Sequence, residues 1–136
     1  MAHSELMNRV VHCCLEVHHT LGPYLLEKVY SRALECELKL NGLSCSVEQW
    51  LSVPYKNIVI PDALRTDIIV EGKLIVELKA IRSGLTADHH KQLYTYMALS
   101  GIEQGLLVNF GADDLFDDGL YRVNNTRPLP FSPTRK

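Results

Sequence analysis

Residues 65–80 read RTDIIVEGKLIVELKA, two runs of strand-forming residues on either side of Glu71-Gly72. The first run contains Asp67, and the second ends in Glu77-Leu78-Lys79. Ionisable side chains buried among Ile, Val and Leu cost several kcal/mol unless a partner compensates their charge. These three ionisable side chains therefore either pair with one another or take part in chemistry.

The second run places two charges on one face of a strand. Residues two apart in a strand point the same way, so Glu77 and Lys79 share a face. Leu78 points to the other face, and its backbone carbonyl is left available at the strand end. A carboxylate, a lysine and a carbonyl oxygen are thus expected close together.

The register of the predicted hairpin decides whether Asp67 joins this group. A two-residue turn at Glu71-Gly72 would set Asp67 opposite Val76, on the face away from Glu77. A loop with an odd number of residues, or one bulge, would set Asp67 directly opposite Glu77. A site that uses both carboxylates therefore predicts the odd register.

Two facing carboxylates repel each other unless a cation or a proton lies between them. Oxygen ligands of this kind suit Mg²⁺ or Mn²⁺, and a nearby lysine can orient or deprotonate a metal-bound water in phosphodiester hydrolysis. The alternative is structural, with Lys79 neutralising Glu77 and Asp67 capping a turn. Spacing alone leaves both interpretations open.

Composition places the chain among soluble proteins of one domain. Its 136 residues are 46% hydrophobic, enough for a sizeable core, and we expect one domain over residues 1–123. The proline-containing remainder, residues 124–136, is expected to be extended or disordered. No apolar run reaches the roughly 18 residues of a membrane helix, and the N-terminal residues lack the order of a signal peptide, so we expect a cytoplasmic protein.

Net charge limits the kind of partner that the chain can bind, and the cysteine spacing indicates the redox state of its thiols. The net charge of −2 excludes the strong positive field of a non-specific nucleic-acid binder, so any nucleic-acid contact must come from a local patch. The four cysteines show no CxxC spacing and are expected to be buried free thiols.

Hydrophobic periodicity predicts the order helix, helix, three or four strands, helix, strand, and a further short strand. The helices are expected at residues 4–20, 23–40 and 86–100, and the strands at 44–54, 58–60, 64–70, 74–80, 105–110 and 120–123. The predicted fold class is α/β, a mixed β-sheet flanked by helices.

Asp67 followed after ten residues by Glu77-Leu78-Lys79 resembles the PD-(D/E)xK nuclease superfamily, whose core runs helix, three strands, helix, strand. More narrowly, the chain resembles the GxxExxY family. The matching stretches are residues 16–18, 21–23, 25–30, 65–67, 75–80 and 105–110, together with Leu85-Thr86, His89, Gln92 and Tyr96. The name-giving glycine of that family falls at Tyr24, so the chain reads YxxExxY and keeps Glu27 and Tyr30.

This resemblance implies a PD-(D/E)xK, restriction-endonuclease-like core preceded by an extra N-terminal helix. It also implies a metal-dependent nuclease acting on DNA or RNA, and a chain this small is expected to grip long nucleic acid only as a homo-oligomer. Asp67, Glu77 and the Leu78 carbonyl would hold Mg²⁺ or Mn²⁺, and Lys79 would position the attacking water. Glu27 would assist as a metal ligand or near one. The alternative is a non-catalytic nucleic-acid or protein binding module that retains the fold.

Other polar residues have competing interpretations. In the later helix, Gln92 is expected to face the site and help hold substrate or water, and His89 is a weaker candidate for the same role. Tyr30 is expected in the core with its hydroxyl satisfied, and His18 is expected to point inward and be hydrogen-bonded.

The first helix carries one further possible site. His12, Glu16 and His19 share a polar helical face that could bind a transition metal, although a solvated face explains them more simply.

Overall fold

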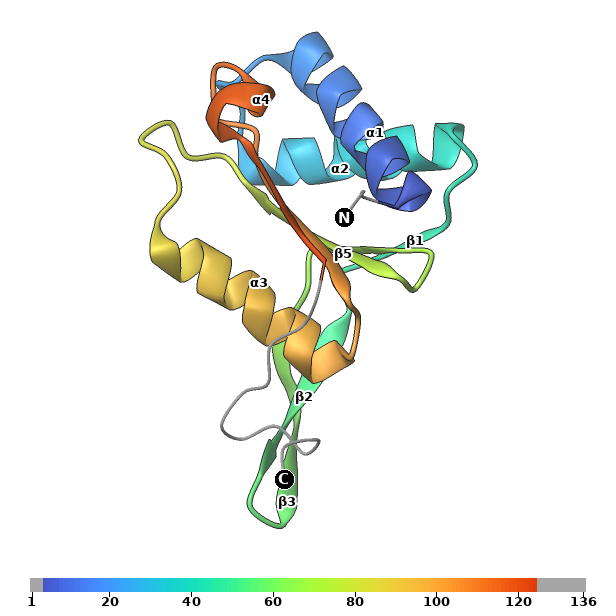
Figure 1. Ribbon diagram of the computed structural model, residues 1–136, viewed down its shortest axis with the longest axis vertical. Helices are drawn as coiled ribbons and strands as arrows, with labels where there is room; N and C mark the ends of the chain where they lie inside the picture. Colours follow the sequence, from blue (N-terminus) through green and yellow to red (C-terminus); the bar gives the residue numbers. More distant parts are fainter. Residues whose placement is uncertain (1–3, 125–136) are drawn as a thin grey trace.

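The computed structural model describes residues 4–124 and shows a central five-stranded sheet with helices on both faces (Figure 1). The helices are α1 (Glu5–Leu21), α2 (Glu27–Leu40), α3 (Ala87–Ser100) and α4 (Leu115–Asp118). The strands are β1 (Cys45–Val47), β2 (Trp50–Tyr55), β3 (Ile58–Arg65), β4 (Ile68–Val70), β5 (Leu74–Lys79), β6 (Gln104–Asn109) and β7 (Leu120–Val123). The α/β prediction is confirmed.

The central sheet has the order β1-β4-β5-β6-β7 and mixes both kinds of pairing. Strands β4 and β5 pair antiparallel, and β5 and β6 pair parallel with α3 as the crossover between them. Alternation along β5 divides the core in two. Leu74, Val76 and Leu78 pack with α1 and α2, whereas Ile75 packs with α3 on the opposite face.

Helix α2 begins at Glu27, so the predicted start at Pro23 was wrong. The loop before it is held by a side chain, since the Leu25 N–H donates to the Tyr30 hydroxyl at 3.1 Å and that hydroxyl donates to the Gly22 carbonyl. Leu26 stays extended at φ −79° and ψ 152°. The Leu25 N–H and the Gly22 carbonyl are therefore satisfied without helical hydrogen bonds.

The strands predicted at 44–54 and 64–70 are each broken in the structure. Their cross-strand register is nevertheless continuous, from Cys45↔Val70 and Val47↔Ile68 in the sheet to Trp50↔Arg65 and Leu51↔Leu64 beyond it. The ribbon bends where Glu48 adopts a φ of 56° opposite Asp67, and the Glu48 N–H still donates to the Asp67 carbonyl at 2.9 Å. One bent ribbon therefore supplies β1 and β4 to the sheet and continues outward as β2 and β3.

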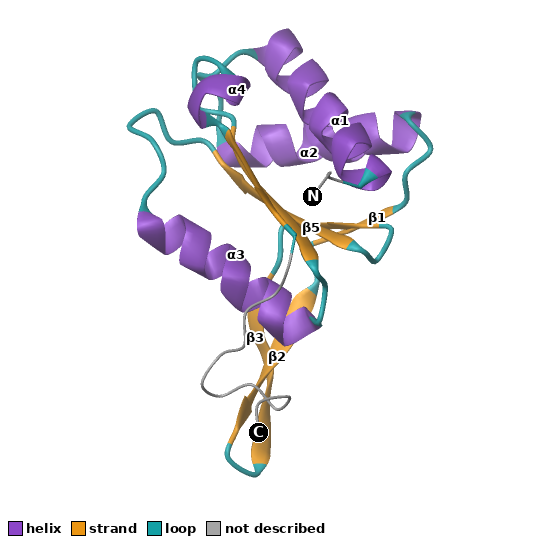
Figure 2. Cartoon of the chain, viewed as in Figure 1, coloured by secondary structure: helices purple, strands orange, loops and turns teal. Residues whose placement is uncertain are grey.

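We call the projecting hairpin of β2 and β3 the arm; it extends away from the body of the molecule (Figure 2). Its second strand runs over the whole of Ile58–Arg65, longer than the predicted 58–60. Pro61-Asp62 does not end this strand, because Asp62 takes a φ of 51° inside an irregularity of the β2–β3 register. The proline is thus accommodated at a bulge.

Two further expectations concern the chain as a whole. In residues 4–124 no helix has the length and apolar character needed to cross a membrane. All four cysteines are free thiols, but only Cys13 and Cys14 are buried, whereas Cys45 is half-buried and Cys36 is exposed on α2. The prediction that all four are buried was therefore wrong. Residues 125–136 of the predicted tail lie outside the described residues.

Candidate active site

The hairpin between β4 and β5 has the odd register. Val70 pairs with Leu74 and Ile68 with Val76, so the connecting loop has three residues, 71–73. Glu71 and Gly72 both take positive φ values, 55° and 65°. The same register, continued by one residue, sets Asp67 opposite Glu77, and this prediction is confirmed.

Direct contacts join the two strands where the ladder ends. The Asp67 N–H donates to Glu77 Oε1 at 3.2 Å, and the Leu78 N–H donates to Asp67 Oδ2 at 2.8 Å. Lys79 O accepts from Phe110 N in the β6 direction, so by strand alternation the backbone polar groups of Leu78 face the β4 side. The Leu78 carbonyl therefore opens toward Asp67, as the metal hypothesis requires.

The bend of the ribbon explains why these groups are free to meet. Thr66 would continue the ladder with β5 in a regular hairpin, but its N–H and hydroxyl both donate to the Gln49 carbonyl, at 2.9 and 3.1 Å. The Leu78 N–H at the end of β5 therefore donates to the Asp67 carboxylate and not to the backbone of a paired strand.

Burial raises the proton affinity of the Asp67 and Glu77 carboxyl groups. Glu77 is 3% exposed, and burial together with the negative Asp67 raises the pKa of Glu77 to about 9. Burial also raises the pKa of Asp67, against the opposing effects of its hydrogen bond from Leu78 and of Lys79. The pair is expected to hold a proton unless a cation takes its place.

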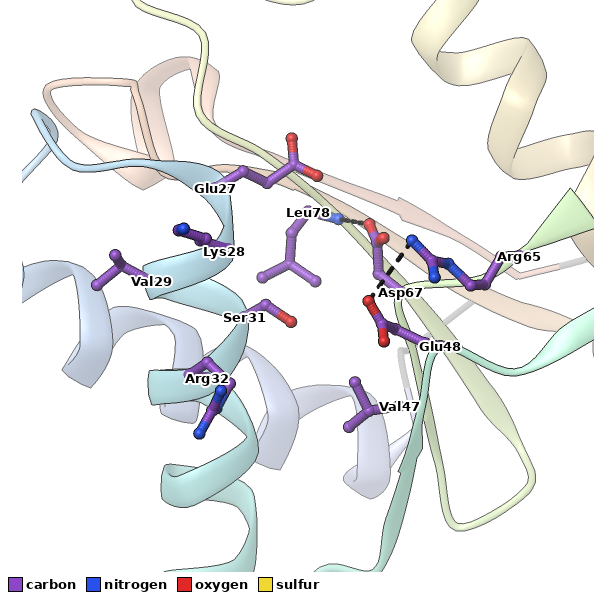
Figure 3. Close-up of a pocket in the computed structure, with 10 residues that line it drawn as sticks. All are labelled: Glu27, Lys28, Val29, Ser31, Arg32, Val47, Glu48, Arg65, Asp67 and Leu78. Atoms are coloured by element: carbon purple, nitrogen blue, oxygen red, sulfur yellow. Dashed lines mark hydrogen bonds and ion pairs between the residues drawn. The ribbon is translucent and has the colours of Figure 1, made fainter.

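Glu27 lies within electrostatic range of this pair. Partial burial and the Asp67 carboxylate raise the pKa of Glu27, while Lys79 lowers it. The side chain remains exposed to solvent at the start of α2, and Figure 3 shows it above Asp67 across an open cleft.

The cleft has a volume of about 730 Å³ and separates α2 from the bent ribbon (Figure 3). Acidic and basic side chains both line it. Its lining residues are Glu27, Lys28, Val29, Ser31, Arg32, Val47, Glu48, Arg65, Asp67 and Leu78. Glu77 and Lys79 are not among them, because by strand alternation they share the α3 face of β5 with Ile75. Asp67 and Leu78 are thus the members of the predicted group that line the cleft, and Asp67 also contacts the Glu77 carboxylate across the strands.

Glu48 also lies in this cleft, although it falls inside the single strand predicted at residues 44–54 and was not a candidate site residue. It stands opposite Asp67 at the bend, and its carboxylate is 3.6 Å from the guanidinium of Arg65. A positive φ at a glutamate has no sequence signal. Only the continuous register of the ribbon, with its bulge at Asp62, would have revealed this position.

Helix α3 presents Gln92 to the site through a tyrosine. Gln92 Nε2 donates to Tyr96 Oη at 2.9 Å. Burial and the nearby Glu77 raise the pKa of Tyr96, which places Tyr96 in the field of the acidic pair. His89 has a different role, since its Nδ1 accepts from the Thr86 N–H at 2.9 Å and caps the helix.

The remaining family positions are structural. Tyr30 is fully buried and stacks on Phe110 with ring centroids 4.7 Å apart, which confirms its predicted place in the core. His18 Nε2 lies 2.7 Å from the Ala112 carbonyl, as expected of an inward histidine. Tyr24 is 77% exposed and packs under the Arg82 guanidinium, 4.7 Å from the ring centroid, so a side chain is accommodated here.

The groups at this site that could hold a metal ion are oxygen atoms of Asp67, Glu77 and Leu78. Within the described part of the chain no three His, Cys, Asp or Glu side chains converge to hold one, and this includes His12, Glu16 and His19 on α1. Two carboxylates and a backbone carbonyl nevertheless match the oxygen ligands of Mg²⁺ and Mn²⁺, which usually retain several waters. Asp67, Glu77 and Leu78 therefore fit a hard divalent cation.

Comparisons with known proteins agree with this geometry. The family model of the PD-(D/E)XK nuclease superfamily matches residues 4–123. A solved structure, that of SSO0001, is similar with 29% sequence identity and a TM-score of 0.54, over 75% of this chain and 50% of that one. The chain thus spans about half the length of that protein, and no curated protein matches. By its sequence over residues 4–123 and by the fold that carries Asp67 and Glu77, the chain belongs to the PD-(D/E)XK nuclease superfamily.

Proposed function

We propose that this chain is a metal-dependent nuclease of the GxxExxY type that hydrolyses phosphodiester bonds in DNA or RNA. Members of the superfamily typically use divalent metal ions, and nucleic acid is the substrate that the superfamily implies. The observation that carries the proposal is the Asp67–Glu77 pairing at the end of β5, with the Leu78 backbone between the two carboxylates.

Each residue has a defined role in this proposal. Asp67, Glu77 and the Leu78 carbonyl would hold the cation, with Glu27 as a ligand or close to one from across the cleft. When bound, the cation would lower the pKa of a water and offset negative charge on the phosphate. Lys79 shares the strand face of Glu77 and orients the attacking water, and Gln92 supports this face through Tyr96.

The cleft supplies positive charge for the nucleic-acid backbone. Lys28 and Arg32 line the cleft from α2, and Arg65 lines it from the ribbon (Figure 3). Basic side chains on two sides of an acidic centre can hold the phosphates that flank the reacting one. Glu27, Glu48 and Asp67 match these three cations in number, so the cleft would become net positive only with a cation bound.

A second candidate function is a non-catalytic binding module for nucleic acid or protein. It is favoured by the depth of Glu77, which is 3% exposed and already hydrogen-bonded to the Asp67 N–H. A buried carboxyl group that already has a hydrogen-bond partner can be part of the fold without taking part in catalysis.

An assay on single- and double-stranded DNA and RNA with Mg²⁺ or Mn²⁺ tests the proposal. Wild-type protein should cut at least one substrate, and Glu77→Ala and Lys79→Ala should each lose about 100-fold or more in rate. Lys73→Ala, an exposed lysine in the same hairpin, is the matched control and should cut normally.

Cleavage that survives both substitutions would exclude this site. If wild type cuts nothing but binds Mn²⁺, and Asp67→Asn abolishes that binding, the binding module is the better description.

A further inference from the structure

The arm leaves the body of the molecule directly beside the candidate active site. Its first cross-strand pair is Trp50↔Arg65, and Arg65 is two residues from Asp67. The next pair, Leu51↔Leu64, belongs to the part of the core between the sheet and α3 that also contains Ile75. Since side chains alternate along a strand, Trp50 and Arg65 lie on the opposite face of the arm, away from α3.

This outer face carries an accessible aromatic ring connected to the cleft. Trp50 is 50% exposed, and the Arg65 guanidinium lies 5.4 Å from the centre of its ring. Arg65 also lines the cleft together with Asp67 and Glu27. One side chain therefore connects the Trp50 ring to the acidic centre.

The charge of the arm distinguishes between two kinds of nucleic acid. Between Trp50 and Leu64 the only charged residues are Lys56 and Asp62, so this part of the arm has no net charge. Gripping a duplex takes lysines and arginines at several phosphates. A single strand, in contrast, binds where an aromatic ring stacks on a base and one or a few cations hold the backbone. The arm fits the second pattern.

We propose that Trp50 and Arg65 form a binding site for one unpaired nucleotide, whose base stacks on Trp50 while Arg65 holds its phosphate. The placement of this nucleotide beside the reacting phosphate rests on the proposed nuclease function. Two strand residues span about 6.6 Å, so a nucleotide at Arg65 is next to, or one removed from, a phosphate at Asp67. The substrate class is therefore single-stranded nucleic acid, or an unpaired end of a duplex.

Trp50 is the only tryptophan of the chain, so its fluorescence reports this site directly. The measurement uses Lys79→Ala protein in EDTA, which prevents turnover, and an oligothymidylate of roughly 10 nucleotides. Stacking should quench the fluorescence saturably, whereas a blunt duplex at the same nucleotide concentration should quench it far less.

Variants in the same background give a second readout, the anisotropy of a labelled oligothymidylate. Trp50→Ala should weaken binding about 5- to 150-fold, the range expected for the loss of one stacked base. Trp50→Phe keeps an aromatic ring and should retain most of the affinity. Tyr55→Ala removes an exposed aromatic at the tip of the arm and is the matched control, with a change of less than about twofold expected.

The site would be overturned by no quenching with the single strand, by equal quenching with the duplex, or by unchanged binding of the oligothymidylate by Trp50→Ala. Fluorescence that depends on protein concentration but not on oligonucleotide would also overturn it, and would point to a second copy of the chain covering the arm. The binding readouts do not need turnover. If wild type cuts nothing with Mg²⁺ or Mn²⁺ while quenching holds, the nuclease proposal fails and the nucleotide site stands.

Discussion

Asp67 and Glu77 are two carboxyl groups that cannot both be charged at low cost in the metal-free protein. Burial and the negative Asp67 raise the Glu77 pKa from 4.5 to about 9, and burial raises the Asp67 pKa as well. Between pH 4.5 and about pH 9, the folded protein therefore keeps a proton on Glu77 that the unfolded chain has released. The free energy of unfolding should therefore fall as the pH rises from about 4.5 to about 9.

Glu77→Gln removes this titration and keeps the shape of the side chain. We expect metal-free wild type to lose about 1–3 kcal/mol more than the variant between about pH 5 and about pH 8.5. Denaturant unfolding in EDTA at a series of pH values measures the difference. Identical pH dependence of the two proteins would show that Glu77 is ionised in the folded state despite its burial.

At the scale of elements, the loop before α2 sets the position of Glu27. The Tyr30 hydroxyl accepts from Leu25 and donates to Gly22, while its ring stacks on Phe110. Tyr30→Phe keeps the stacking but leaves the Leu25 N–H and the Gly22 carbonyl without this partner.

The expected cost of Tyr30→Phe is about 1–2 kcal/mol in the free energy of unfolding, with faster hydrogen exchange at the Leu25 amide. Tyr24→Phe serves as the control, because that ring is 77% exposed and its change should stay within about 0.5 kcal/mol. Equal stability of Tyr30→Phe and wild type would mean that water replaces the hydroxyl at no cost.

The same elements show how far sequence reasoning reaches. Period-two alternation grouped Glu77 with Lys79 but left the register of the hairpin open, because Ile68, Ile69 and Val70 are apolar and buried on both faces of β4. The odd register was predicted only from the requirement that Asp67 meet Glu77, and the structure has it. The bend at Glu48 was not predictable, since a positive φ at a non-glycine residue is set by tertiary contacts such as Thr66 with the Gln49 carbonyl. The start of α2 was misplaced because the decisive contact, from Tyr30 to Gly22, joins residues eight apart.

Sequence reasoning also did not predict that the candidate site residues lie on both faces of β5, because this too depends on tertiary structure. Sequence spacing correctly grouped Glu77 with Lys79, but it could not show that the cleft lies on the other face with Leu78 and is reached through Asp67. That arrangement depends on where the ribbon leaves the sheet. Glu48 and Arg65 join the cleft through the same bend, so the contact of Asp67 with Glu77 was predicted from the site hypothesis and the lining of the cleft was not.

At the scale of the whole molecule, the proposed metal joins β4 and β5 at the point where the arm departs, so binding should stabilise the entire fold. A ligand that binds only the folded state adds about 2.7 kcal/mol at 100 times its Kd. For a chain of this size, that corresponds to a Tm rise of roughly 5–10 °C. Thermal unfolding with increasing Mn²⁺ should show this rise in wild type. Asp67→Asn should abolish it, whereas Asp88→Asn, which changes an exposed aspartate on α3, should keep it. Equal Tm shifts in all three proteins would place the bound cation elsewhere, because Asp67 lies in the cleft beside the end of β5 whereas Asp88 lies on α3.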